Sequence, residues 1–170
     1  MSEPTKPNGF FDDGVTPCIM LAEQRWPIPV FGVKQLRHVV PAVSRVTTAM
    51  RELSERRLAE LSPTQRAAVL AQVPQDVATL GEDRALRNRL WAITDFPVEM
   101  SREMTDEVFE ALVTAVFWAL RRAHPALTLE EFEEMPIGMI ELINCIGVIA
   151  DQTGMMRKAD PSADPLARRG

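Results

Sequence analysis

Apolar residues recur at spacings of three and four along most of the chain, which is the periodicity of amphipathic helices. The clearest stretch lies between residues 106 and 123, where valine, leucine and phenylalanine side chains would form one broad apolar stripe. Thr105 precedes this stretch and can cap its first amides, while His124 and Pro125 follow it and stop it. We therefore predict a helix over Asp106–Ala123.

A second long helix is predicted from Val33 to Leu61. Its first part places an apolar stripe at helical spacing, and its second part alternates acidic and basic side chains around leucines. Pro41 lies inside this helix. Because proline removes an amide donor and crowds the preceding turn, we expect a kink or a break near Val40.

Proline, glycine and capping residues divide the middle of the chain. Ser62 followed by Pro63 predicts the start of a short helix, since serine caps free amides and proline suits the first helical position. The amphipathic stretch Glu82 to Ile93 predicts another helix. Between these two helices, residues 74–81 are a candidate hinge, and residues 94–103 are predicted to be a loop.

Two more helices are predicted towards the end of the chain. Thr128 and Glu131 match a capping box that would start a short helix. The last helix should run from about Ile137 to Thr153, with Gly154 as its C-terminal cap. Because this last helix is apolar nearly all round, it fits either a core helix or a contact between copies of the chain.

The start of the chain has a different pattern. Between Val15 and Phe31, the apolar stretches CIML and WPIPVF flank a polar group, which predicts two short strands in a hairpin. Pro27 and Pro29 lack amide donors and confine the second strand to a sheet edge or to an extended segment. The expected fold is mainly α: one small helical domain over residues 15–155 that begins with this hairpin or extended segment.

Composition separates the two ends of the chain from the rest. Residues 1–14 are rich in proline and glycine and predict a flexible arm, while the polar, proline-bearing residues 156–170 predict a disordered tail. The 170 residues are 46% hydrophobic, which is enough for one core. The net charge of -5 argues against a nucleic-acid partner. Without a signal peptide pattern or an apolar run long enough to span a bilayer, a cytosolic protein without a membrane partner is expected.

Residue types that carry catalysis or bind metals form no recognised pattern in this sequence. His38 and His124 belong to no metal-binding pair, and Cys18 and Cys145 are predicted to be free thiols. Phosphate-binding glycine motifs and a serine nucleophile motif are missing from the sequence as well. We therefore expect no catalytic, cofactor or metal site and no enzyme. A site assembled from distant residues, such as Cys145, His38 and Asp151, is the alternative.

Apolar side chains near both ends of the predicted domain are candidates for contacts with another protein. Aromatic and aliphatic anchors are typical of interfaces, although packing in the core is the competing explanation for each residue. The candidates are Trp26, Ile28, Phe31, Ile140 and Ile143. The glutamates within residues 130–134 are predicted to form a solvated face.

Two stretches of the chain have the element order of a known family. They are WPIPVFGVKQLRHVVPAV, from Trp26 to Val43, and FWALRRAHPALTLEEFEEMPIGMIELINCIGVIADQTGM, from Phe117 to Met155. An extended proline-bearing segment leads into a helix, and later a capped turn and short helix lead into an apolar helix that closes at TG. This order resembles the small tail assembly chaperones encoded in tail-gene clusters of long-tailed bacteriophages and prophages.

The resemblance implies a helical chaperone that binds the long tape measure protein, keeps it soluble and helps tail tube proteins polymerise around it. It also implies action in the cytoplasm of the bacterial host during phage assembly, and absence from the finished particle. No functional residue of that family transfers by position. The alternative is a structural virion protein of the tail or the head-to-tail connector, and a homo-oligomer is left open.

Overall fold

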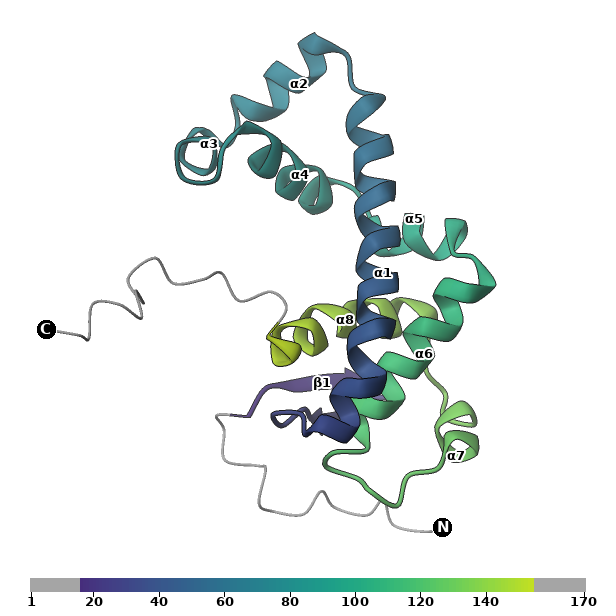
Figure 1. The fold of residues 1–170 in the computed structure, drawn as a ribbon. Helices are drawn as coiled ribbons and strands as arrows, with labels where there is room; N and C mark the ends of the chain where they lie inside the picture. The colour runs from purple at the N-terminus through teal and green to yellow at the C-terminus, as the bar shows by residue number, and fades with distance from the viewer. Residues whose placement is uncertain (1–15, 155–170) are drawn as a thin grey trace, which may run out of the picture.

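Two long helices, α1 (Val33–Ala59) and α6 (Asp106–Leu120), pack against each other and organise the fold (Figure 1). The computed structural model describes residues 16–154, within which eight helices and one two-stranded sheet form. The prediction of a mainly α fold with an N-terminal hairpin is confirmed. The predicted flexible arm, residues 1–14, and the predicted disordered tail, residues 156–170, lie outside the described residues.

The hairpin joins β1 (Cys18–Leu21) and β2 (Gln24–Pro27) as an antiparallel pair. Ala22 and Glu23 form the two-residue turn, with φ angles of 50° and 61°. Positive φ at both turn residues matches the right-handed twist of the strands, which explains why so short a turn connects them. Pro27 is the last residue of β2, so the proline ends the strand as its missing donor requires.

Helix α1 passes through Pro41 without interruption, so the predicted break near Val40 does not occur. The amide that proline lacks would have bonded to the carbonyl group of Arg37. Both Pro41 and Arg37 are exposed, so water can hydrate the carbonyl that loses its partner. The remaining bonds of this helix of 27 residues are enough to carry it past the proline.

Helices α7 (Leu129–Glu133) and α8 (Met139–Thr153) complete the main core. α8 packs against α6, α1, α5 and β1, which makes it the central element of this part of the fold. The fully buried large side chains here are Leu21, Ile28, Val39, Val43, Val46, Leu53, Leu112, Val116, Leu120, Ile146 and Ile149. Ile143, Ile146 and Ile149 of α8 are buried and belong to this core.

The predicted helix caps of this region are confirmed. The Thr105 hydroxyl accepts a hydrogen bond from the amide of Val108, and Thr128 and Glu131 form the reciprocal capping box. Gly154 ends α8 at a φ of 75°, in the left-handed region that glycine tolerates. Local side-chain chemistry therefore sets these helix boundaries.

Three further helices project away from this core (Figure 1): α2 (Pro63–Leu70), α3 (Pro74–Leu80) and α4 (Glu82–Ile93). We call α2–α4 the lobe, and the hairpin with α5–α8 the body; α1 runs through both. Helices α2 and α3 contain no buried residue, while α4 buries Ala85, Leu86 and Leu90. These three buried residues are not part of the main core cluster. The lobe therefore has a thin core of its own.

Two segments differ from their predictions. The candidate hinge at residues 74–81 forms α3, with Pro74 in the first turn and Gly81 just beyond its end. The predicted loop at residues 94–103 is wrong, because Phe96–Glu103 forms α5. Both helices have a proline in their first turn, where proline is preset for helix and its missing donor costs nothing.

Candidate partner-binding pocket

A pocket of about 270 Å³ lies where the lobe joins α1. Its walls come from the second half of α1, the first turn of α2, the exposed end of α4 and the link into α5. Apolar atoms provide most of the lining surface, and the charged residues of the lining are Arg57, Glu60 and Arg87. Five lining residues carry the arguments below: Ser54, Arg57, Arg87, Trp91 and Phe96.

The aromatic wall is held in place by contacts within the fold. Trp91 stacks on Phe96 with 4.0 Å between ring centroids and an interplanar angle of 12°. The indole Nε1 of Trp91 donates a hydrogen bond of 2.6 Å to the hydroxyl of Ser54, which in turn donates to the carbonyl of Met50 at 3.0 Å. Ser54 is the one buried polar residue among those described. These bonds fix the orientation of the Trp91 indole, which remains 37% exposed.

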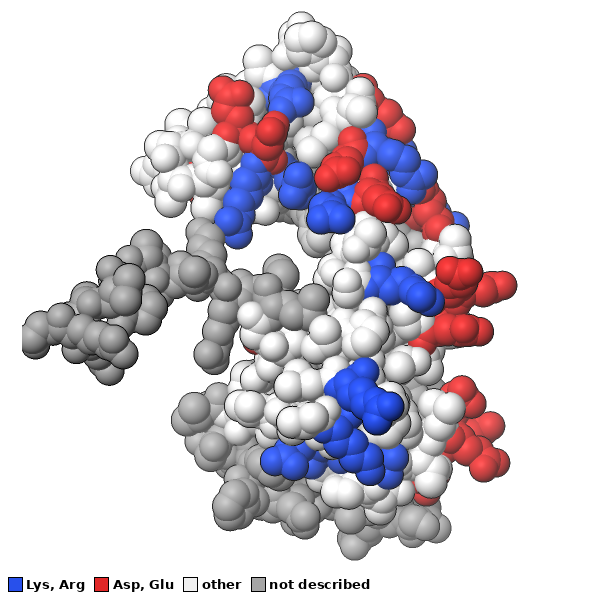
Figure 2. All heavy atoms as spheres, viewed as in Figure 1, with Lys and Arg blue, Asp and Glu red and all other residues white. Residues whose placement is uncertain are grey.

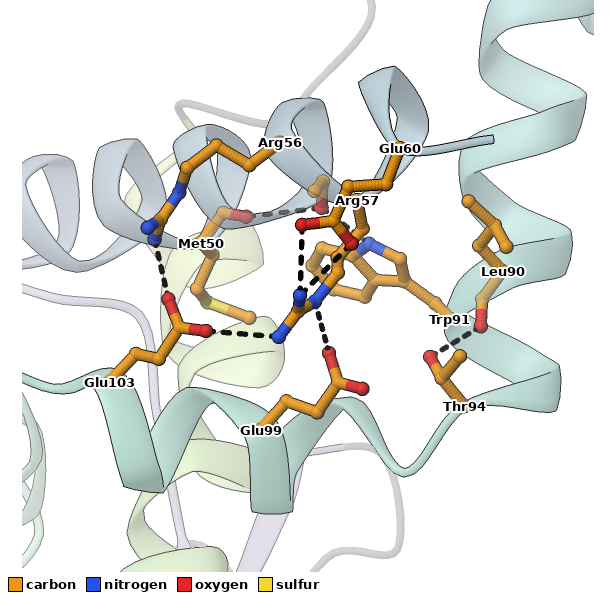
Figure 3. Close-up of polar contacts among 10 residues, drawn as sticks. Met50, Arg56, Arg57, Glu60, Leu90, Trp91, Thr94, Glu99 and Glu103 are labelled. Atoms are coloured by element: carbon orange, nitrogen blue, oxygen red, sulfur yellow. Dashed lines mark hydrogen bonds and ion pairs between the residues drawn. The ribbon is translucent and has the colours of Figure 1, made fainter. Parts of the chain in front are cut away.

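Arg57, which lines the pocket, binds three glutamates (Figure 3). Its guanidinium donates to Glu60 at 3.1 Å, to Glu99 at 3.0 Å and to Glu103 at 3.0 Å. Arg56 also binds Glu103, at 2.7 Å. The hydrogen bonds from Arg57 to Glu60 and then to Glu99 raise the pKa of Arg57 above its ordinary value. Every nitrogen of the Arg57 guanidinium is used, and the cluster ties α1 to α5.

Arg87 is the second arginine of the pocket, and no partner of its guanidinium is found among residues 16–154. Its Nε is buried and has no hydrogen-bond acceptor among the described residues, and no carboxylate in residues 16–154 forms an ion pair with it. Two other arginines of this region do have partners: Arg66 pairs with Asp83, and Arg89 donates to the side-chain oxygen of Gln72. Because a buried donor without a partner lowers stability, an acceptor that reaches Arg87 would be bound favourably.

A second group of aromatic contacts surrounds the end of α6 in the body. His38 stacks on Trp118, with 3.9 Å between centroids, and Arg121 lies 5.3 Å over the same indole. Trp26 meets His124 edge to face at 4.8 Å. Burial lowers the pKa of His124, and its Nε2 has no hydrogen-bond partner within the described residues. These side chains join the hairpin and α1 to α6.

The five residues predicted to bind a partner do not share one exposed surface. Ile28, Phe31 and Ile143 are buried, with exposed fractions of 0%, 6% and 3%. Trp26 is half-buried against His124, and Ile140 is 41% exposed at the start of α8. Ile28, Phe31 and Ile143 therefore belong to the core. A role in partner binding stays a prediction for all five residues. The predicted solvated face holds, since Glu130, Glu131, Glu133 and Glu134 are exposed.

The thiol of Cys145 is poorly suited to nucleophilic chemistry. Burial, with a smaller effect from Glu141, raises its pKa to about 12, so the thiol stays protonated at neutral pH. Its Sγ donates to the carbonyl of Glu141 at 3.0 Å, and the carboxylate of Glu141 caps α8 by accepting from the amide of Gly138. Within residues 16–154, no three metal-ligating side chains gather at one point. The predictions of no enzyme and no metal site stay predictions.

The pocket was not found from the sequence, because its walls come from segments that are far apart along the chain. One local signal was available: Arg87 and Trp91 are four residues apart in α4, so they lie on the same face of that helix. Nothing in the local pattern places Ser54 or Phe96 beside them. No family model, curated protein or solved structure matches the chain. None of the helices in the described part is long and apolar enough to cross a membrane.

Proposed function

We propose that the protein is a phage tail assembly chaperone that binds the tape measure protein through non-catalytic contacts. The observation that carries the proposal is the pocket between α1 and the lobe, whose aromatic wall is fixed in place yet partly exposed. Concave apolar sites with fixed aromatic side chains are typical of surfaces that take side chains of another protein. The resemblance of residues 26–43 and 117–155 to tail assembly chaperones supplies the partner.

The thin core of the lobe suits reversible binding. Helices α2 and α3 contain no buried residue, and their apolar side chains Val69, Leu70, Val77 and Leu80 are only half-buried. Elements with few buried contacts open and rearrange at low free-energy cost. A chaperone needs this property because it must hold its client and later release it to the tail tube proteins.

In this proposal the protein acts in the cytoplasm of the bacterial host and is absent from the finished particle. The competing function, a structural virion protein of the tail or connector, predicts the opposite location. Purified particles that contain the protein in stoichiometric amounts would therefore support the structural function over the chaperone function.

Coexpression with the tape measure protein of the same phage or prophage tests the proposal. We expect the chain to increase the soluble fraction of the tape measure protein and to copurify with it. Trp91→Ala should weaken this capture by at least about tenfold, since it removes the wall of the pocket. Ile93→Ala is the matched control, because Ile93 is an exposed apolar residue of α4 that does not line the pocket.

Circular dichroism melting of both variants shows whether each is folded before its binding is compared. A tape measure protein that stays insoluble and is not captured by the wild-type chain would contradict the proposed function. Equal capture by Trp91→Ala and Ile93→Ala would leave a chaperone that binds elsewhere, and would contradict the use of this pocket.

A further inference from the structure

The two arginines that line the pocket differ in their partners, and this difference indicates what the pocket binds. Arg57 already has three carboxylate partners, whereas Arg87 has no acceptor among the described residues. Arg89 lies on the same helix as Arg87, and its partner is the neutral amide of Gln72, so its charge is not neutralised. Figure 2 shows basic side chains gathered along the side of the lobe that faces the body. An anionic group is therefore the complement of this side of the pocket.

The size and lining of the pocket limit that anion. Its volume of about 270 Å³ is below the roughly 300–1,000 Å³ of pockets that enclose drug-sized ligands, so it suits one or two side chains. The apolar wall formed by Leu90, Trp91 and Phe96 needs an apolar neighbour for the anion. A nucleic acid is a poor fit, because a chain of phosphates needs several free cations, and of the two arginines that line the pocket Arg57 is already paired with carboxylates.

We infer that the pocket recognises a helical segment of the partner protein in which an aspartate or glutamate lies beside an apolar residue. The apolar side chain packs against Trp91 and Phe96, and the carboxylate accepts hydrogen bonds from the guanidinium of Arg87. Residues three or four apart on the partner helix present both groups together. This inference rests on the proposed function in one respect, since the partner is taken to be the tape measure protein.

Isothermal titration calorimetry of the full chain with overlapping peptides from the tape measure protein tests the inference. We expect Arg87→Gln to weaken the binding peptide at least tenfold, and Arg87→Lys to weaken it less. Arg84→Gln is the matched control, because Arg84 is an exposed arginine of the same helix that does not line the pocket. Replacing one acidic residue of the peptide by its amide should weaken wild-type binding by a similar factor and leave Arg87→Gln binding unchanged.

Two outcomes would overturn the inference: Arg87→Gln binds the peptide as tightly as the wild type, or no single acidic residue of the peptide matters. A second comparison does not depend on the tape measure protein, and uses a synthetic leucine–glutamate amphipathic helix and its leucine–lysine counterpart. Wild-type protein should bind the acidic peptide at least tenfold more tightly, and Arg87→Gln should lose this preference. If the preference is found while the tape measure protein is not captured, the proposed function fails and the inference stands. A wild-type chain without the preference overturns the inference whatever its partner is.

Discussion

At the scale of residues, buried polar atoms differ in whether they have a hydrogen-bond partner within the fold. The Ser54 hydroxyl is buried and bonded on both sides, so it serves as a fixed support for Trp91. Arg87 Nε and His124 Nε2 are buried without a partner among the described residues. Arg87 lines a pocket, whereas the imidazole ring of His124 packs edge to face on Trp26, so the two residues have different consequences.

The free energy of unfolding is predicted to fall as the pH drops below about 6.5, because of His124. Burial lowers the pKa of its imidazole in the folded state below the ordinary value of 6.5. The unfolded chain therefore takes up the proton first, and the loss continues until the pH has passed the folded pKa. Urea unfolding between about pH 7.5 and 5.5, where most carboxylates stay ionised, measures this dependence. His124→Gln should flatten it, and an unchanged slope in this variant would contradict the assignment.

At the scale of elements, helices that begin with a polar cap could be predicted from the sequence, and helices that begin with proline alone could not. Thr105 and Thr128 mark the starts of α6 and α7 by hydrogen bonds to nearby amides, a signal that lies within four residues. Pro74 and Pro97 lie in the first turns of α3 and α5, and neither helix has a side-chain cap. Because proline also interrupts helices, both prolines were interpreted as helix breakers. The pocket could not be predicted for a different reason: its walls meet only after the tertiary fold has formed.

The packing of α8 gives a prediction at this scale. Ile143 is buried, so Ile143→Ala should lower the free energy of unfolding by about 2–5 kcal/mol through lost apolar contacts and a cavity. Ile140→Ala, on the same helix, is the control: its side chain is 41% exposed, and its effect should stay within about 0.5 kcal/mol. Denaturant unfolding of both variants measures the difference. Equal effects of the two substitutions would show that α8 does not pack as described.

At the scale of the whole molecule, stability is distributed unevenly between body and lobe. The main core cluster contains residues of the hairpin, α1, α5, α6, α7 and α8, and none from the lobe. The three buried residues of α4 lie outside that cluster. The lobe is joined to the rest of the fold by the continuous α1, by the short link from α4 to α5, and by the contacts of Trp91 with Phe96 and Ser54.

Hydrogen exchange is predicted to be faster in α2 and α3 than in α6 and α8. Because α2 and α3 contain no buried residue, opening them exposes little apolar surface and costs less free energy than opening the core helices. Exchange measured by mass spectrometry on the free chain tests this, with α6 as the internal reference. Similar protection in all four helices would refute the uneven distribution. Addition of a peptide that occupies the pocket should slow exchange in the lobe.

The binding of Arg57 to Glu99 also has a consequence for how such a protein can diversify. The chain leaves the body near Glu60 and returns at Phe96, and the 3.0 Å ion pair keeps these two points close together. The residues between these two points form an inserted segment whose two ends lie close together. Insertions, deletions or replacement of this segment would leave the packing of the body intact. Under the proposed function, partner preference could therefore change between descendants of one ancestor by exchange of this segment, while the remaining scaffold is inherited unchanged.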